Sequence, residues 1–180
     1  MSDATADPSS DPYEIADELS HEVGGIIRRH AGYAAVGGLI PIPLVEVFAC
    51  GTIQLRMISQ LCDVYDVPFS EQAVKAAIGS LVGAVLPVSS LGYGALSLSR
   101  AVPVVGPLLT VATIPALAAA VTWAVGRVFA WHFASGGTIG DFDVKTKKEA
   151  FKREFEEGKR RVSKLVRGKR AKEEQKDTSS

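Results

Sequence analysis

The middle of this chain lacks charged side chains. No Asp, Glu, Lys or Arg lies between residues 76 and 99 or between residues 101 and 126, and only Arg100 separates the two stretches. A helix on the surface of a soluble protein normally has a charged face, so neither stretch fits that class of helix. Each is also long enough to cross a bilayer, which takes about 20 apolar residues.

Two interpretations account for these charge-free stretches. In the first, they form two membrane-inserted helices that make a hairpin, with Gly79 and Gly83 as a small-xxx-small pair that lets helices approach closely. In the second, they are core helices of a soluble bundle. We expect the first, because two consecutive stretches without a charged face are unusual for helices that pack in water.

Basic side chains are absent from the N-terminus. The first 22 residues contain seven Asp or Glu and no Lys or Arg, whereas residues 145–180 contain fourteen Lys or Arg and seven Asp or Glu. Positive charge beside the apolar stretches favours the cytoplasmic side, so we expect a protein of the cytoplasmic membrane with both tails in the cytoplasm. Nucleic-acid binding is not expected, because the acidic N-terminus offsets the basic tail and aromatic residues are not interleaved with basic ones.

Several residue types that carry chemistry are scarce. The two cysteines, Cys50 and Cys62, lack Cys-x-x-Cys spacing, which favours buried free thiols in a reducing compartment. The three histidines are scattered, with His21 and His30 on the predicted helix 12–37 and His132 on another, and no phosphate-binding loop with its lysine is present. Residues 136–140 are interpreted as a turn. We therefore expect no catalytic residue, no metal and no cofactor.

No window alternates apolar and polar residues as a strand would, so the predicted fold class is all-α. Proline, glycine and capping residues delimit about five helices. The predicted helices cover residues 12–37, 44–65, 71–87, 108–133 with a kink at Pro115, and 144–167.

The same markers divide the chain into four parts. Residues 1–10 are predicted to be a disordered acidic tail, and residues 171–180 a second disordered tail. Residues 11–143 form the apolar helical domain, and residues 144–170 form a basic amphipathic helix.

A few polar residues and glycines stand out within the apolar helices. Glu46, Gln54 and Arg127 are the structural polar candidates, because an unpaired buried charge is costly. We predict an ion pair between Glu46 and Arg127. Gly126, like Gly79 and Gly83, is predicted to permit close helix packing.

The last helix is predicted to bind a lipid surface or a partner. Phe151 and Phe155 form an apolar stripe, and Lys159, Arg160 and Arg161 lie beside it. A narrow apolar stripe with basic residues around it is typical of helices that lie on anionic membranes.

Together these residues resemble a bacterial family, domain of unknown function family 697. The resemblance rests on Pro41-Ile42-Pro43-Leu44-Val45-Glu46, Ile53-Gln54-Leu55-Arg56-Met57-Ile58, Leu61, Tyr65-Asp66-Val67, Ala124-Val125-Gly126-Arg127-Val128-Phe129, His132-Phe133 and Gly136-Gly137. It covers roughly residues 22–158 and departs at Glu46, where aspartate is expected. It implies an apolar helical domain, often membrane-embedded and often fused to or encoded beside Era-like GTPases. It implies no catalytic residue.

The functional expectation is a non-enzymatic, membrane-associated helical protein that docks a partner in a GTPase system. Membrane lipids, an Era-like GTPase and a second copy of the chain in a homo-oligomer are the expected partners. One alternative is a soluble helical interaction module with an unusually apolar core. The other is a carrier that holds an apolar ligand between its helices.

Overall fold

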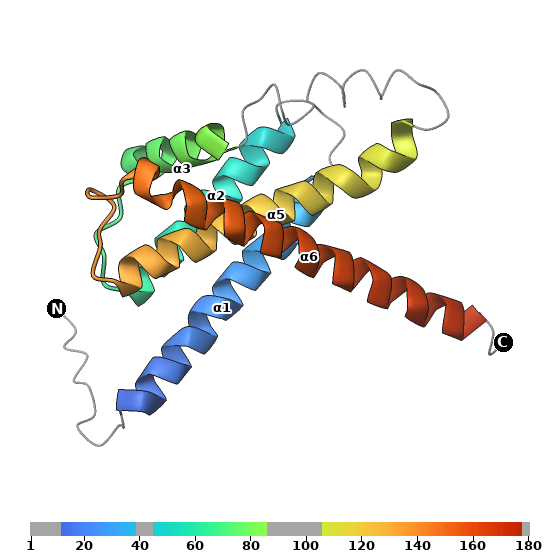
Figure 1. Ribbon diagram of the computed structural model, residues 1–180, viewed down its shortest axis with the longest axis horizontal. Helices are drawn as coiled ribbons and strands as arrows, with labels where there is room; N and C mark the ends of the chain where they lie inside the picture. Colours follow the sequence, from blue (N-terminus) through green and yellow to red (C-terminus); the bar gives the residue numbers. More distant parts are fainter. Residues whose placement is uncertain (1–11, 39–44, 86–105, 178–180) are drawn as a thin grey trace.

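The computed structural model describes residues 12–38, 45–85 and 106–177, and Figure 1 shows their arrangement. These residues form five helices and no strand, which confirms the all-α prediction. The helices are α1 (Pro12–Gly37), α2 (Val45–Val64), α3 (Glu71–Val85), α5 (Gly106–Ala134) and α6 (Val144–Asp177). The predicted tail 1–10 and residues 86–99 of the charge-free stretch 76–99 lie outside the described residues.

The helix ends follow from local chemistry. Helix α5 ends at Ala134 and is followed by Gly136, whose φ of 81° suits a residue without a side chain. The amide of Gly137 donates to the carbonyl of His132 over 3.0 Å, a bond that satisfies a carbonyl of the last turn. At the start of α6, the Asp143 carboxylate accepts a hydrogen bond from the amide of Lys145 over 3.1 Å. The predicted turn at residues 136–140 is confirmed, and Asp143 caps the first turn of α6.

Helix α5 lies at the centre of the bundle. It packs against α1, α2 and α6, while α3 packs against α6 and α2 (Figure 1). All five helices contribute to one apolar core, which includes Ile26 and Ile27 of α1, Met57, Ile58 and Leu61 of α2, Val74 and Leu81 of α3, Val125, Val128 and Phe129 of α5, and Phe151 of α6. The charge-free part of α5, up to Gly126, is therefore matched by apolar neighbours on several sides.

One helix in the described part is long and apolar enough to cross a membrane. It is the segment Pro115–Ala134 of α5, and 61% of its most apolar window is buried inside the bundle. The other predicted membrane helix, the stretch 76–99, includes residues 86–99, which lie outside the described part. The two-helix hairpin therefore stays a prediction.

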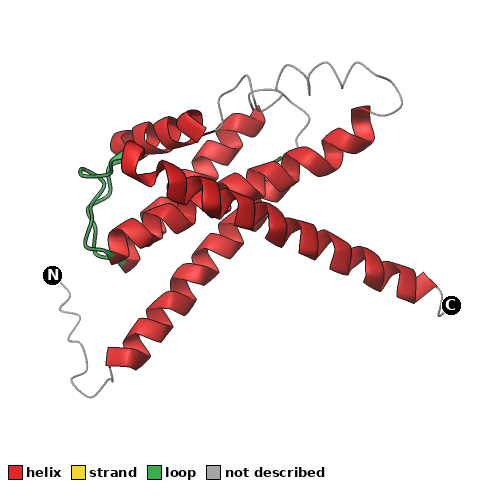
Figure 2. Cartoon of the chain, in the orientation of Figure 1, coloured by secondary structure: helices red, strands yellow, loops and turns green. Residues whose placement is uncertain are grey.

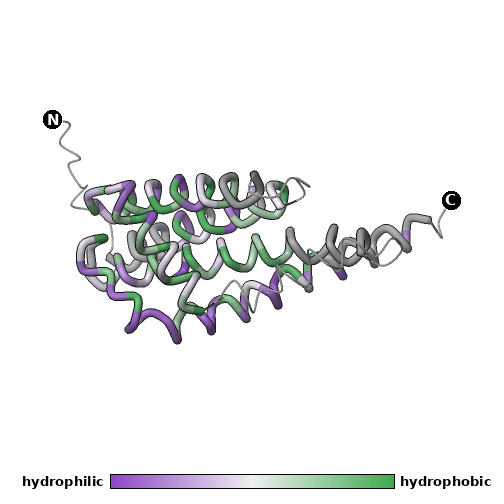
Figure 3. Tube along the Cα trace, turned by 90° about the horizontal axis from the view of Figure 1, so that it is seen from above, coloured by the Kyte–Doolittle hydropathy of each residue, from purple (hydrophilic) through white to green (hydrophobic). Residues whose placement is uncertain are grey.

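The bundle has two chemically different ends. The loops after α2 and α5, residues 65–70 and 135–143, lie together at one end (Figure 2), and much of this end is hydrophilic in Figure 3. At the other end, the last turn of α1 meets α2 and α5. A Cβ on Gly37 would lie 3.6 Å from Ile53, and one on Gly38 would lie 3.0 Å from the Cα of Pro115.

Helix α6 is longer than predicted. It runs to Asp177 rather than ending near Arg167, so residues 171–177, predicted as a disordered tail, are helical. Its apolar stripe ends at Val166, which is why the sequence predicted an earlier end. The first half of α6 packs on the bundle, and the second half extends away from it (Figure 1).

Candidate functional site

The polar residues within the apolar helices form a small closed cluster. Gln54 and Thr122 are buried, and the Gln54 side-chain amide donates to the Thr122 hydroxyl over 3.3 Å. Cys50 lies beside both, with its sulfur 3.6 Å from the Gln54 nitrogen and 3.8 Å from the Thr122 oxygen. This cluster links α2 to α5 and satisfies a buried amide. It therefore explains Gln54 as a helix-registering residue.

Both cysteine thiols are held in the protonated form. Burial raises the pKa of Cys50, against a smaller opposing effect of the Thr122 hydrogen bond. Burial and the negative charge of Asp63 raise the pKa of Cys62 to about 11. Because the thiolate is the nucleophile and the metal ligand, neither cysteine is set up for such chemistry at neutral pH. The described residues also contain no group of three His, Cys, Asp or Glu that could hold a metal ion.

The structure pairs Arg127 with Glu154 of α6. The Arg127 Nε lies 3.5 Å from a Glu154 carboxylate oxygen, and about half of the Arg127 side chain is exposed. Its positive charge also lowers the pKa of Tyr65, although burial raises that pKa more. The side chain of Glu46 lies outside the described part of the chain, so the predicted Glu46–Arg127 pair remains a prediction.

The three glycines predicted to pack helices occupy different surroundings. A Cβ on Gly126 would lie 3.0 Å from Ile27 and 3.0 Å from Met57, so α1, α2 and α5 meet closely there. A Cβ on Gly79 or Gly83 would meet nothing within 4 Å. Both glycines are exposed and no described residue packs closely on them, so their predicted packing role stays a prediction. Their shared face of α3 points away from the core, and the sequence does not define that rotation.

Two residues predicted to contact lipid or a partner are buried instead. Phe151 is fully buried and Phe155 is 7% exposed, because both pack into the core. The prediction that they form an external surface is wrong. An apolar stripe on a helix has the same sequence pattern whether it packs on its own bundle or on a membrane. Lys159, Arg160 and Arg161 are exposed and pair with Glu156 or Glu157 of the same helix.

Cations of α6 cover both tryptophans of α5. The Lys147 ammonium lies 4.4 Å from the ring centre of Trp131, and the Arg161 guanidinium lies 4.5 Å from that of Trp123. Such cation–π contacts supplement the packing of α6 on α5. Near the second contact, Gly158 of α6 fits against the backbone of Ala120, where a Cβ would lie 3.0 Å from the Ala120 carbonyl oxygen.

A histidine-centred loop at the end of α5 was missed by the sequence analysis. The His132 ring is buried, and its Nε2 donates to the Thr138 carbonyl over 2.8 Å and lies 3.2 Å from an Asp141 carboxylate oxygen. The Thr138 hydroxyl and amide donate to the same Asp141 oxygen. Gly137 lies so close to the His132 ring that any side chain would collide with it. The spacing His132, Gly137, Thr138 and Asp141 was the available signal.

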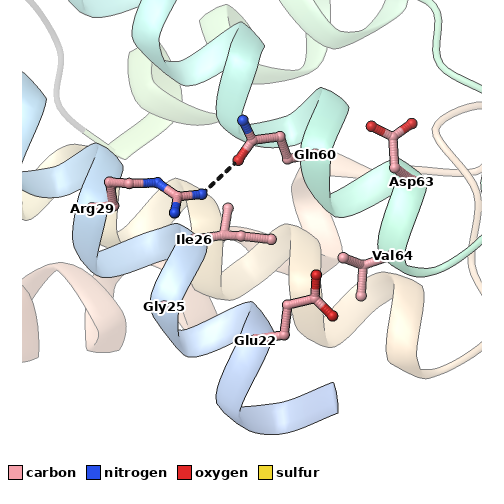
Figure 4. Close-up of a pocket in the computed structure, with 7 residues that line it drawn as sticks. All are labelled: Glu22, Gly25, Ile26, Arg29, Gln60, Asp63 and Val64. Atoms are coloured by element: carbon pink, nitrogen blue, oxygen red, sulfur yellow. Dashed lines mark hydrogen bonds between the residues drawn. The ribbon is translucent and has the colours of Figure 1, made fainter. Parts of the chain in front are cut away.

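A groove of about 620 Å³ lies between α1 and α2 (Figure 4). It is lined by Glu22, Gly25, Ile26, Arg29, Gln60, Asp63 and Val64. The Arg29 guanidinium donates to the side-chain amide oxygen of Gln60 over 3.0 Å. In Figure 4 the carboxylates of Glu22 and Asp63 are not bonded to the other residues drawn. The groove therefore offers acidic groups beside a small apolar surface.

Comparison with known families assigns the helical domain. The family model described as domain of unknown function (DUF697) matches residues 13–160. The chain belongs to the DUF697 family. The DUF697 match begins nine residues earlier than the resemblance seen in the sequence and covers all of α2, α3 and α5. It includes the Gln54 cluster, the Arg127–Glu154 pair and the His132 loop, and it ends just after Gly158.

One curated relative is similar over nearly the whole chain. It is named magnetosome membrane protein 22, from Magnetospirillum gryphiswaldense, and is 34% identical over 175 residues, which is 94% of this chain and 85% of the relative. No solved structure matches the chain. The similarity extends beyond the family domain into the C-terminal half of α6.

Proposed function

We propose that this protein is a non-enzymatic, membrane-associated helical protein that docks a partner. The observation that carries this proposal is the similarity to a protein named as a membrane protein, which extends over 94% of the chain. The charge-free sequence on either side of Arg100 supplies the physical basis. It offers apolar surface for insertion, and helices satisfy their own backbone groups in lipid.

The arrangement of the described helices supports insertion at one end of the bundle. The C-terminal end of α3 and the N-terminal end of α5 flank residues 86–105, in which Arg100 is the single charge. The last turns of α1, nearby, expose Tyr33 and Val36 to 53% and 66%. The outer ends of α1 and α6 lie on the opposite side of the bundle (Figure 1). This placement is consistent with both tails in the cytoplasm at the inner membrane.

The packing of α5 favours a shallow mode of attachment. Because α1, α2 and α6 cover much of Pro115–Ala134, this segment already has protein neighbours. The contact with lipid would then come mainly from residues 86–105 and the first turns of α5. The second candidate function, a soluble interaction module with an apolar core, is favoured by the same burial of α5.

A membrane fractionation experiment separates these two functions. The wild-type chain is expected to stay with the membrane after carbonate washing. Leu96→Lys, which adds a charge within the charge-free stretch, should release much of it, because a charged side chain in contact with the bilayer interior disfavours insertion. The matched control Gln72→Lys adds the same charge at an exposed position of α3 and should leave the protein in the membrane fraction.

A monodisperse wild-type protein in the soluble fraction without detergent would favour the soluble module. Release of both variants to the same extent would indicate a general loss of folding rather than a loss of insertion.

The partner in this proposal is an Era-like GTPase, the class that the family resemblance implies. The surface of this chain that binds the GTPase would be the hydrophilic end of the bundle, where the loops 65–70 and 135–143 lie together. The test is a binding measurement between the purified chain and Era-like GTPases from the same genome, loaded with GTP or GDP. A change of affinity with the nucleotide is expected. Absence of binding in both states would remove the GTPase from the proposal and leave the membrane association.

A further inference from the structure

Two parts of the helices extend beyond the bundle and carry opposite charge. The first is the acidic arm, residues 12–22 of α1, with Glu14, Asp17, Glu18 and Glu22 and no Lys or Arg. The second is the basic arm, residues 163–172 of α6, with Lys164, Arg167, Lys169, Arg170 and Lys172 and no Asp or Glu. Figure 1 shows the two arms diverging from the bundle, so the arms of one chain do not cover each other.

Each arm also continues an apolar stripe that is buried inside the bundle. On α1, Ile15 and Leu19 precede the buried Val23 at helical spacing. On α6, Leu165 follows the buried Phe151 and Phe155 and is 74% exposed. An exposed leucine at the end of a buried stripe indicates a surface that lacks a cover. Lys164 and Arg167 are exposed and make no ion pair within the described residues.

We propose that these arms form the interface of a homodimer, in which the acidic arm of each copy packs along the basic arm of the other. At about 1.5 Å per residue, both arms are roughly 15 Å long, so they can pair along their whole length. A two-fold axis would make the contact twice and close the assembly. Opposite charges set the orientation, and the apolar stripes meet between the helices.

The groove between α1 and α2 extends this interface. It begins at Glu22, the last acidic residue of the acidic arm, and continues to Asp63 of α2. A lysine or arginine from the basic arm of the second copy fits this groove, since its charged head would meet the two carboxylates and its stem the side chain of Val64. The groove therefore provides a defined binding position for the basic arm beside Glu22, where the acidic arm joins the bundle.

A second copy is favoured over an anionic membrane as the occupant of the basic arm. The residues that would anchor an amphipathic helix in lipid, Phe151 and Phe155, are buried in the bundle. Lipid would also leave the acidic arm and its stripe uncovered. A second copy covers both arms at once with the complementary surface that each lacks.

Charge reversal with mixing tests the dimer. One variant carries Glu14→Lys, Asp17→Lys, Glu18→Lys and Glu22→Lys. The other carries Lys164→Glu, Arg167→Glu, Lys169→Glu and Arg170→Glu. The oligomeric state of the full chain is measured by sedimentation at low and high salt, in neutral detergent where the protein requires it. A third variant with Lys145→Glu, Lys152→Glu and Arg153→Glu, on the bundle half of α6, is the control.

The wild type and the control are expected to form a salt-sensitive dimer, and each arm variant a monomer, with the dimer Kd raised roughly tenfold or more. An equimolar mixture of the two arm variants should form a heterodimer, because each then supplies the charge that the other needs. Misfolded variants could not be rescued in this way.

Three outcomes would overturn the proposal. They are a monomeric wild type, dimeric arm variants, and arm variants that fail to associate when mixed. A monomeric wild type whose binding to anionic vesicles is lost only in the basic-arm variant would assign that arm to lipid instead. None of these outcomes depends on residues 86–105, so failure of the dimer is distinguishable from failure of the membrane proposal.

Discussion

Helices α3 and α5 have similar sequences in one respect and opposite surroundings in the structure. Both are free of charge over most of their length, yet α5 is enclosed by α1, α2 and α6, whereas α3 keeps one face open at Gly79 and Gly83. The helix with the stronger membrane signature is thus the centre of the protein core. High hydropathy therefore identifies segments that avoid water, but it does not identify the surface that replaces the water.

The largest effect on this comparison is expected from removing the cover of α5. Gly158→Leu would force α6 away, because the obstacle is the backbone of Ala120, which cannot move aside. We expect a loss of about 3 kcal/mol in the free energy of unfolding, at the upper end of what overpacking costs. Gly32→Leu on α1, an exposed position where a Cβ would meet nothing within 4 Å, is the control. Equal thermal stability of the two variants would contradict the packing of α6 on α5.

A second pair of variants compares the two helices directly. Gly126→Leu on α5 should lower stability by about 2 kcal/mol, since Ile27 and Met57 must shift but are flexible side chains. Gly83→Leu on α3 should change it by less than about 0.5 kcal/mol, because its face is open and leucine favours helix. Thermal melts of the two variants test the difference. A Gly83→Leu variant that melts as low as Gly126→Leu would show that α3 is covered, for example in an oligomer.

A smaller effect is expected at Arg127, the charged residue of α5 that pairs with Glu154. Arg127→Gln and Glu154→Gln should show a coupling energy below about 1 kcal/mol in a double-mutant cycle, because the Arg127 side chain is 48% exposed. The same cycle with Glu46→Gln tests the pair predicted from the sequence. Additivity with Glu154 and coupling with Glu46 would reverse the assignment made by the structure.

The smallest effect is expected in the His132 loop that follows α5, and it is expected only at acid pH. Hydrogen bonds from the Thr138 hydroxyl, the Thr138 amide and His132 hold the pKa of Asp141 below its usual range, against a smaller effect of burial. The ionised carboxylate therefore adds stability that is present above the ordinary Asp pKa of about 3.9 and is lost as the pH falls through the lowered pKa. In Asp141→Asn this acid loss should be reduced. If the melting temperatures of the two proteins fall equally between about pH 5 and pH 3, Asp141 does not contribute to this acid loss of stability.

The sequence was sufficient for the helices and insufficient for their partners. Proline, glycine and capping residues mark helix ends locally, so most ends lie within two or three residues of the prediction. Asp177 was missed because α6 continues beyond its apolar stripe. The partner of Arg127, the exposure of Gly83 and the burial of Phe151 depend on how helices rotate against one another. That rotation is set by the whole core and leaves no local sequence signal.

Because of the cation–π contacts between α5 and α6, the fluorescence of the two tryptophans depends on how these helices pack. The protein contains two tryptophans, and both are on α5 beneath a cation from α6. Trp123 is shielded, with its indole nitrogen buried, whereas Trp131 is 58% exposed. Tryptophan fluorescence therefore arises entirely at this helix pair, with one emitter in an apolar setting and one near water. Detachment of α6, on a membrane or on a partner, would be visible in the emission spectrum without any added label.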